Sequence, residues 1–202
     1  MRVFIHNSSY NFANSYIVGP DGPGDALIID PVGLDVPLLE LIENHRYYVR
    51  TVLLTTVRQQ TVHGVRTLKR VYDAEIYSGY PQVFEFSSRG VERRQTLDLP
   101  GVSVEAIPLQ HYSRYSLVFR MCGIVFTGIM MSAGLIGERH AEAERLLLAQ
   151  ALRETLTPLP DETVVFPVLG PPSTLGAERR FNADLQAPRT SDFCERHQDS
   201  HA

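Results

Sequence analysis

Apolar residues in the first half of the chain either alternate with polar residues or recur every three to four positions. The alternating and continuous apolar runs predict strands, and a Gly- and Pro-rich turn at residues 19–24 separates the second strand from the third. The longer period predicts two helices, each followed by a buried strand. The predicted segments are strands at 3–6, 15–18, 26–30, 50–55 and 74–77, a helix capped by Asp35, and a helix from His63 to Tyr72.

The pattern weakens between residues 80 and 100 and is regular again afterwards. Alternation predicts a strand, and apolar runs on both sides of Cys122-Gly123 predict a hairpin. The remaining predicted segments are a strand at 102–106, a helix at 138–156, a core strand at 163–166 and a short helix at 174–181. Two β-rich blocks, each followed by helices, indicate a layered α/β sandwich. We predict one domain, residues 1–182, and a polar tail, residues 183–202.

Composition narrows the classes of function. The 202 residues are 44% hydrophobic and 21% charged, which is typical of one soluble globular domain. A net charge of −4 gives no field that would hold a polyanion, and this argues against nucleic-acid binding. The two cysteines, Cys122 and Cys194, are too few for a disulfide framework. The N-terminus has no signal-like apolar segment, and the uncharged stretch at residues 121–137 is too short to span a bilayer, so we expect a cytoplasmic protein without a membrane partner.

Four segments share the order and spacing of motifs in one known family. These motifs are its opening strands with an Asp-Pro turn, the strand before a His-x-His-x-Asp-His loop, two strands leading to a histidine and an aspartate, and a Pro-Gly-His-Gly-Pro turn. The segments are residues 14–18 with 26–31, residues 52–55, residues 107–111 with 124–128, and residues 164–176. The chain therefore resembles the metallo-β-lactamase superfamily in its short glyoxalase II-like form. The resemblance implies a four-layer αββα sandwich.

When the family's metal-ligand positions are aligned with this chain, most of them hold residues that are poor metal ligands. The positions of its seven ligands are held here by Thr56, Arg58, Gln60, Thr61, His111, Ile129 and Leu169. Zinc needs three or four nitrogen, sulfur or carboxylate ligands, so one histidine implies no dinuclear site and no cofactor. Ile129 and Leu169 are expected to fill the former site with apolar side chains. Shifting the loop by two residues would bring in His63 but still gives one histidine there, so we assign His63 to the first turn of a helix.

Several polar residues have more than one interpretation. Asp30 corresponds to an aspartate that supports the family's metal site, and we expect it to bind loop N–H groups. Arg58 could pair with Asp30, which we prefer, could bind an anion together with Gln60 and His111, or could point into solvent. Cys122 is expected to be buried. The pairs Arg93-Arg94 and Arg179-Arg180 are expected to be solvated edges rather than phosphate sites.

The residues at the former ligand positions favour a catalytically silent relative of the superfamily, with a degenerate active site. It would act as a binding or interaction module. Its partner would be a protein or a small anionic ligand, and self-association stays open. The alternative is a hydrolase with a displaced metal or a metal-free site around His111, Arg58 and Gln60. Nucleic-acid recognition is a third hypothesis, and the net negative charge argues against it.

Overall fold

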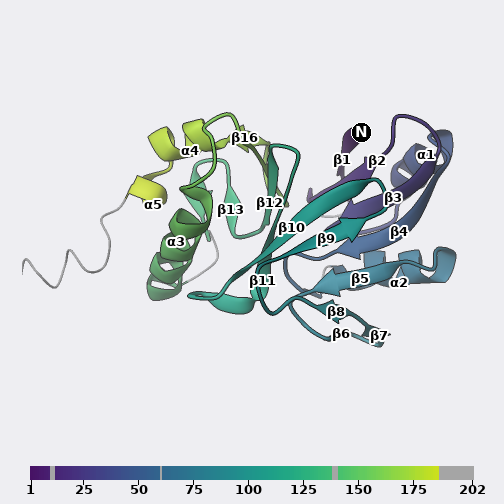
Figure 1. Ribbon diagram of the computed structural model, residues 1–202, viewed down its shortest axis with the longest axis horizontal. Coiled ribbons are helices and arrows are strands. Elements are labelled where there is room, and N and C mark those ends of the chain that lie inside the picture. The colour runs from purple at the N-terminus through teal and green to yellow at the C-terminus, as the bar shows by residue number, and fades with distance from the viewer. Residues whose placement is uncertain (10–11, 60, 138–140, 187–202) are drawn as a thin grey trace, which may run out of the picture.

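Two six-stranded sheets stack face to face in the computed structural model, which describes residues 1–9, 12–59, 61–137 and 141–186 (Figure 1). The first sheet has the strand order β1 (Arg2–Asn7), β2 (Asn14–Gly19), β3 (Gly24–Ile29), β4 (Tyr47–Leu53), β5 (Glu75–Ser78) and β8 (Arg89–Gly90). The second has the order β16 (Ser173–Thr174), β15 (Val164–Pro167), β12 (Ile124–Gly128), β11 (Ser113–Met121), β10 (Val102–Leu109) and β9 (Gln95–Leu99). Two small hairpins, β6 (Gln82–Val83) with β7 (Phe86–Ser87) and β13 (Met131–Ser132) with β14 (Leu135–Ile136), extend from them.

Helices cover the outer face of each sheet. The first sheet carries α1 (Val36–Asn44) and α2 (Thr61–Val71), and the second carries α3 (Glu142–Leu156) (Figure 1). Three apolar layers hold this arrangement together, since Leu38 and Leu68 pack under the first sheet, Leu53 and Phe119 lie between the sheets, and Leu152 packs on the second sheet. The predicted αββα sandwich is confirmed.

Local sequence signals account for most element boundaries. The side chain of Asp35 accepts a hydrogen bond from Leu38 N and caps α1, as predicted. The α3 helix begins at Glu142 rather than at residue 138, and residues 138–140 lie outside the described ranges.

No helix in the described ranges is long and apolar enough to cross a bilayer.

The predicted hairpin between β11 and β12 turns at Cys122 and Gly123, which have φ angles of 46° and 75°. Two successive positive φ angles are typical of the tight turns that match the twist of a hairpin. The turn points Cys122 outward, so our expectation of a buried cysteine is wrong.

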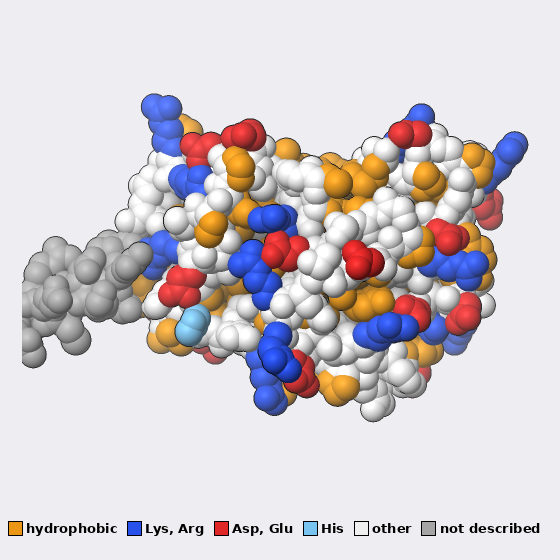
Figure 2. Space-filling view, in the orientation of Figure 1, with side chains coloured by type: hydrophobic (Ala, Val, Ile, Leu, Met, Phe, Trp, Pro, Cys, Tyr) orange, Lys and Arg blue, Asp and Glu red, His pale blue; other side chains and the backbone are white. Residues whose placement is uncertain are grey.

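Charges of both signs are interspersed on the face drawn in Figure 2, where Lys and Arg side chains lie among Asp and Glu. Ion pairs join some of the charged residues of the protein, such as Arg94 and Arg120 with Glu105. That face therefore offers no extended basic patch of the kind that phosphate backbones require.

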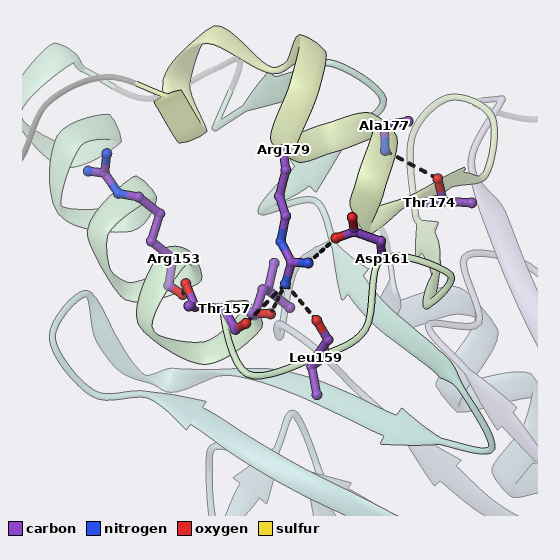
Figure 3. Close-up of polar contacts among 8 residues, drawn as sticks. Arg153, Thr157, Leu159, Asp161, Thr174, Ala177 and Arg179 are labelled. Atoms are coloured by element: carbon purple, nitrogen blue, oxygen red, sulfur yellow. Dashed lines mark hydrogen bonds and ion pairs between the residues drawn. The ribbon is translucent and has the colours of Figure 1, made fainter.

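Arg179 ties the last helices to the end of α3 (Figure 3). It projects from α4 (Leu175–Phe181), and its Nη2 donates to the carbonyls of Leu156, Thr157 and Leu159 at 2.9, 3.1 and 2.7 Å, while Nη1 pairs with Asp161. The carbonyls at a helix C-terminus have no partner within the helix, and the guanidinium satisfies them. The expectation of a solvated Arg179 is thus wrong.

Residues 183–186, which the sequence assigns to the tail, form α5 (Ala183–Gln186) and are part of the fold. Leu185 packs against the core beneath α3, and Asp184 accepts from Ile136 N at 3.2 Å and pairs with Arg145 at 3.6 Å. Residues 187–202 of the predicted tail lie outside the described ranges.

Candidate functional site

Asp30 follows β3 in a left-handed conformation, with φ of 49° and a side chain that is 2% exposed. Thr55 donates to both carboxylate oxygens, from its backbone N–H to Oδ1 at 2.9 Å and from its hydroxyl to Oδ2 at 2.8 Å. Burial raises the pKa of Asp30 to about 7, and the two hydrogen bonds from Thr55 oppose this shift. The expectation that Asp30 binds a loop N–H group is confirmed.

The preferred pairing of Arg58 with Asp30 is wrong. The Arg58 side chain is exposed, whereas the Asp30 carboxylate is buried and is satisfied by Thr55. Within the described ranges, the Arg58 guanidinium has no hydrogen-bond or ion-pair partner. Burial and the charge of Glu144 raise the pKa of Tyr112, and the positive charge of Arg58 opposes this shift.

The ends of β4 and β12 meet at Thr55. A Cβ on Gly128 would lie 2.1 Å from Thr55 Oγ1, and Gly128 has a φ of 62°, so both space and backbone conformation require glycine there. This close approach places Ile129, the next residue, at the edge where the two sheets come together.

Ile129 and Leu169 pack into one aliphatic cluster with three buried residues, Ala13, Val32 and Val168. The turn that carries Leu169 is fixed by Asn14, whose amide donates to the carbonyls of Pro167 and Gly170 at 3.0 and 2.8 Å. The structure therefore brings together the two positions that the resemblance aligns with the bridging aspartate and the last histidine. Aliphatic side chains occupy both.

The loop after β4 uses its hydroxyl groups locally. Thr61, at the first position of α2, is buried and donates to the carbonyl of Arg58 at 2.7 Å. Thr56 is half-buried, Gln60 lies outside the described residues, and His63 is an exposed residue in the first turn of α2, as predicted.

His111 lies in the turn between β10 and β11 and faces α3. Its side chain is 73% exposed, and Nε2 lies 3.6 Å from Oε2 of Glu154. Both residues line a hollow of about 210 Å³ with Arg94. The hollow that His111 lines contains neither Ile129 nor Leu169.

This donor set does not fit a metal ion. Thr61 is engaged by backbone, Arg58 is a cation, and the paired positions 129 and 169 are aliphatic. Among the described residues, no three His, Cys, Asp or Glu side chains are grouped closely enough to hold a metal. The former ligand positions in the described ranges therefore offer a metal ion no complete ligand set.

A different hollow, of about 480 Å³, opens beside the loop after β4. It is lined by Val57, Arg58, Gln59, His63, Arg66 and Phe84. We call it the α2 pocket. Sequence reasoning did not find it, because Phe84 falls in the segment where the pattern is weak and only the tertiary fold brings it against α2.

The layering and the strand-end loops define a sandwich of the metallo-β-lactamase type. No family model matches the sequence. ETHE1 from Myxococcus xanthus superposes with a TM-score of 0.80 at 19% identity, covering 100% of this chain and 92% of that one. TTHA1623, solved in a di-iron-bound form, superposes with a TM-score of 0.73 at 25% identity, covering 89% and 98%.

Several relatives match in sequence, among them the following two. An uncharacterized protein of Treponema pallidum is 30% identical over 185 residues, covering 91% of this chain and 99% of that protein. A hydroxyacylglutathione hydrolase of Methylobacillus flagellatus is 26% identical over 119 residues, covering 58% of this chain and 47% of the hydrolase. The BLEG-1 B3 metallo-β-lactamase superposes with a TM-score of 0.80 at 18% identity, covering 92% of this chain and 100% of that one, so this chain has the metallo-β-lactamase fold.

Proposed function

We propose that this chain is a metal-free member of the superfamily that acts by binding a ligand or partner rather than by hydrolysis. The observation that carries the proposal is the packing of Ile129 and Leu169 with Ala13, Val32 and Val168. A dinuclear site requires anionic or imidazole donors at both positions. Ile129 and Leu169, both half-buried, instead pack against these three aliphatic residues and offer no donor atom to a metal ion.

The polar groups around the cluster support the same proposal. The carboxylate of Asp30 and the hydroxyl of Thr61 both bind groups of the chain itself, so neither is left aimed at a ligand. Satisfied buried polar groups stabilise one conformation of the loops. The strand ends would then serve as a rigid platform for surface residues such as Arg58.

The alternative, a hydrolase centred on His111, Arg58 and Gln60, is favoured by the partial match to hydroxyacylglutathione hydrolase. A general base must come within hydrogen-bond reach of the group it deprotonates. His111 instead lies beside Glu154 on α3, and the hollow that it lines does not include Arg58. A cytoplasmic location remains a prediction, as does a single domain, which now includes α5 (Ala183–Gln186).

Turnover assays test the proposal directly. The purified chain would be offered thioester, phosphodiester and lactam substrates, with and without added Zn²⁺, beside His111→Ala and Arg58→Ala variants. We expect the wild-type chain to match the enzyme-free blank. Turnover that disappears in His111→Ala would overturn the proposal and support the hydrolase.

A further inference from the structure

The α2 pocket combines an unused cation with an aromatic wall. Arg58 and His63 are both exposed and have no side-chain partner among the described residues. Arg58 belongs to the loop after β4, His63 to the first turn of α2, and both line the same hollow. Guanidinium groups bind carboxylates and phosphates in a forked geometry, so an unpartnered arginine in a hollow is suited to an anion.

The surrounding charges leave this end of the pocket positive. Arg66 also lines the hollow, but it is paired with Glu85 through bonds of 2.6 and 3.1 Å. Arg70 adds a second positive charge near Glu85 and helps to lower the pKa of that carboxyl. Glu85 is therefore neutralised within its own pairs, and Arg58 keeps its full charge for a ligand.

The opposite wall is apolar and is held in place. Phe84 turns the β6–β7 hairpin with a φ of 53°, a conformation that side chains rarely adopt. Gln82 Nε2 donates to the carbonyl of Phe84 at 2.8 Å, and the Arg66–Glu85 pair ties the hairpin to α2. A positive φ is typical of a tight hairpin turn, so the turn itself fixes the place of Phe84. With Val57, the Phe84 ring offers a surface for a flat apolar group.

We propose that the α2 pocket binds a small organic anion, with its carboxylate or phosphate on Arg58 beside His63 and its apolar ring against Phe84. This proposal rests on the binding role proposed above and gives that role a site and a ligand class. His111 takes no part, because it lies in another hollow. The amide of Gln59 lines the pocket as well and is available to a polar substituent.

Phenyl phosphate joins the two required groups in one probe. Its dissociation constant for the full chain would be measured by calorimetry, with inorganic phosphate as the probe that lacks the ring. We expect phenyl phosphate to bind more tightly than inorganic phosphate, and its binding to weaken as salt is added. Arg58→Ala should weaken binding about three- to tenfold, since Arg58 is exposed and its interactions are screened.

Arg93→Ala is the matched control, since Arg93 is exposed and does not line the pocket. It should leave the affinity unchanged, and Arg58→Lys, which keeps the charge but not the fork, should fall between wild type and Arg58→Ala. Equal affinities for the two probes, or an Arg58→Ala affinity equal to wild type, would overturn the assignment of the site.

Phosphorus NMR of the same samples separates this inference from the proposed function. We expect the phenyl phosphate signal to persist. Growth of an inorganic phosphate signal that requires the protein would mean hydrolysis and would overturn the binding-only role, even where the Arg58 dependence holds. A persistent signal without Arg58 dependence overturns the pocket alone.

Discussion

Both hydrogen-bond donors of Thr55 are directed at the carboxylate of Asp30, one to each oxygen, at 2.9 and 2.8 Å. Asp30 follows β3 and Thr55 follows β4, so this double contact joins two neighbouring parallel strands just beyond their last ladder pairs. The same hydroxyl lies against Gly128 of the other sheet. Thr55 is thus a structural link between the loops where the family builds its metal site.

Removing this hydroxyl should destabilise the fold. Thr55→Val keeps the volume and the backbone N–H but leaves Oδ2 of the buried Asp30 without its donor. We expect the free energy of unfolding to fall by about 1–3 kcal/mol, the cost of an unsatisfied buried group. Urea unfolding measures it, and Thr56→Val, the same change at the half-buried neighbour, should cost clearly less. Equal effects of the two variants would contradict the structural role of Thr55.

The raised pKa of Asp30 predicts an unusual dependence of stability on pH. With a folded pKa of about 7 against an ordinary value of 3.8, the folded chain holds a proton that the unfolded chain releases. This group therefore contributes most stability below pH 3.8, and the contribution is lost as the pH rises through 7. The free energy that Asp30 contributes to stability changes by at most about 1.4 kcal/mol per pH unit.

Unfolding curves of wild type and Asp30→Asn between pH 5 and 8 test this sign. As the pH rises, the free energy of unfolding of wild type should fall relative to that of Asp30→Asn, whichever protein is the more stable at pH 5. A difference that is flat with pH would show that Asp30 is ionised in the folded protein throughout this range.

Arg179 should contribute more to stability than its neighbour Arg180. Arg179→Ala leaves the carbonyls at the end of α3 without their donor (Figure 3), and we expect a loss of about 1.5–3 kcal/mol. Arg180 is exposed and lies over the Phe181 ring, so Arg180→Ala should cost no more than about 1 kcal/mol. Thermal melting of both variants makes the comparison, and a larger loss for Arg180→Ala would refute it.

The apolar pattern predicted a layered α/β sandwich because each sheet buries one face on helices and the other on its partner, and the family resemblance added the number and order of the layers. The apolar residues of β3 and β4, and the Asp35 cap of α1, are local signals that tertiary structure preserves. The contacts of Arg58 and Cys122 were mispredicted because they depend on geometry that no local pattern encodes. Asp30 finds its donors 25 residues away, and the turn at Cys122 decides which way the thiol points.

The short α5 was missed for a similar reason. Four residues are too few for a helical period to show, and α5 is held by Leu185 under α3 and by Asp184 on Ile136 N. The α2 pocket likewise depends on a hairpin that the weak pattern between residues 80 and 100 did not reveal. The former ligand positions could be assigned from the resemblance, but only the structure shows which of them are neighbours.

Restoring the family's ligands one at a time should be harmful. Ile129→Asp places a carboxylate in the aliphatic cluster, and we expect a loss of about 1–3 kcal/mol, against a smaller loss for Ile129→Val. Zinc should rescue only a variant with the complete set. That variant combines Thr56→His, Arg58→His, Gln60→Asp, Thr61→His, Ile129→Asp and Leu169→His.

At a thousandfold excess over its dissociation constant, zinc would add about 4 kcal/mol of stability to this sixfold variant, which offsets only part of the combined penalties. Zinc titration followed by thermal melting measures the effect. A variant that folds but binds no zinc would show that the loops have moved and that the position-by-position carry-over is wrong.

Metal content distinguishes a metal-free binding protein from a metalloenzyme in a single measurement. The wild-type chain would be expressed in medium supplemented with zinc, iron and manganese, purified without chelator and analysed by mass spectrometry for metals per chain. We predict far less than one ion per chain and a melting temperature that a chelator leaves unchanged, because aliphatic side chains hold two of the ligand positions. About one or more ions per chain, lost together with stability on chelation, would contradict a metal-free protein.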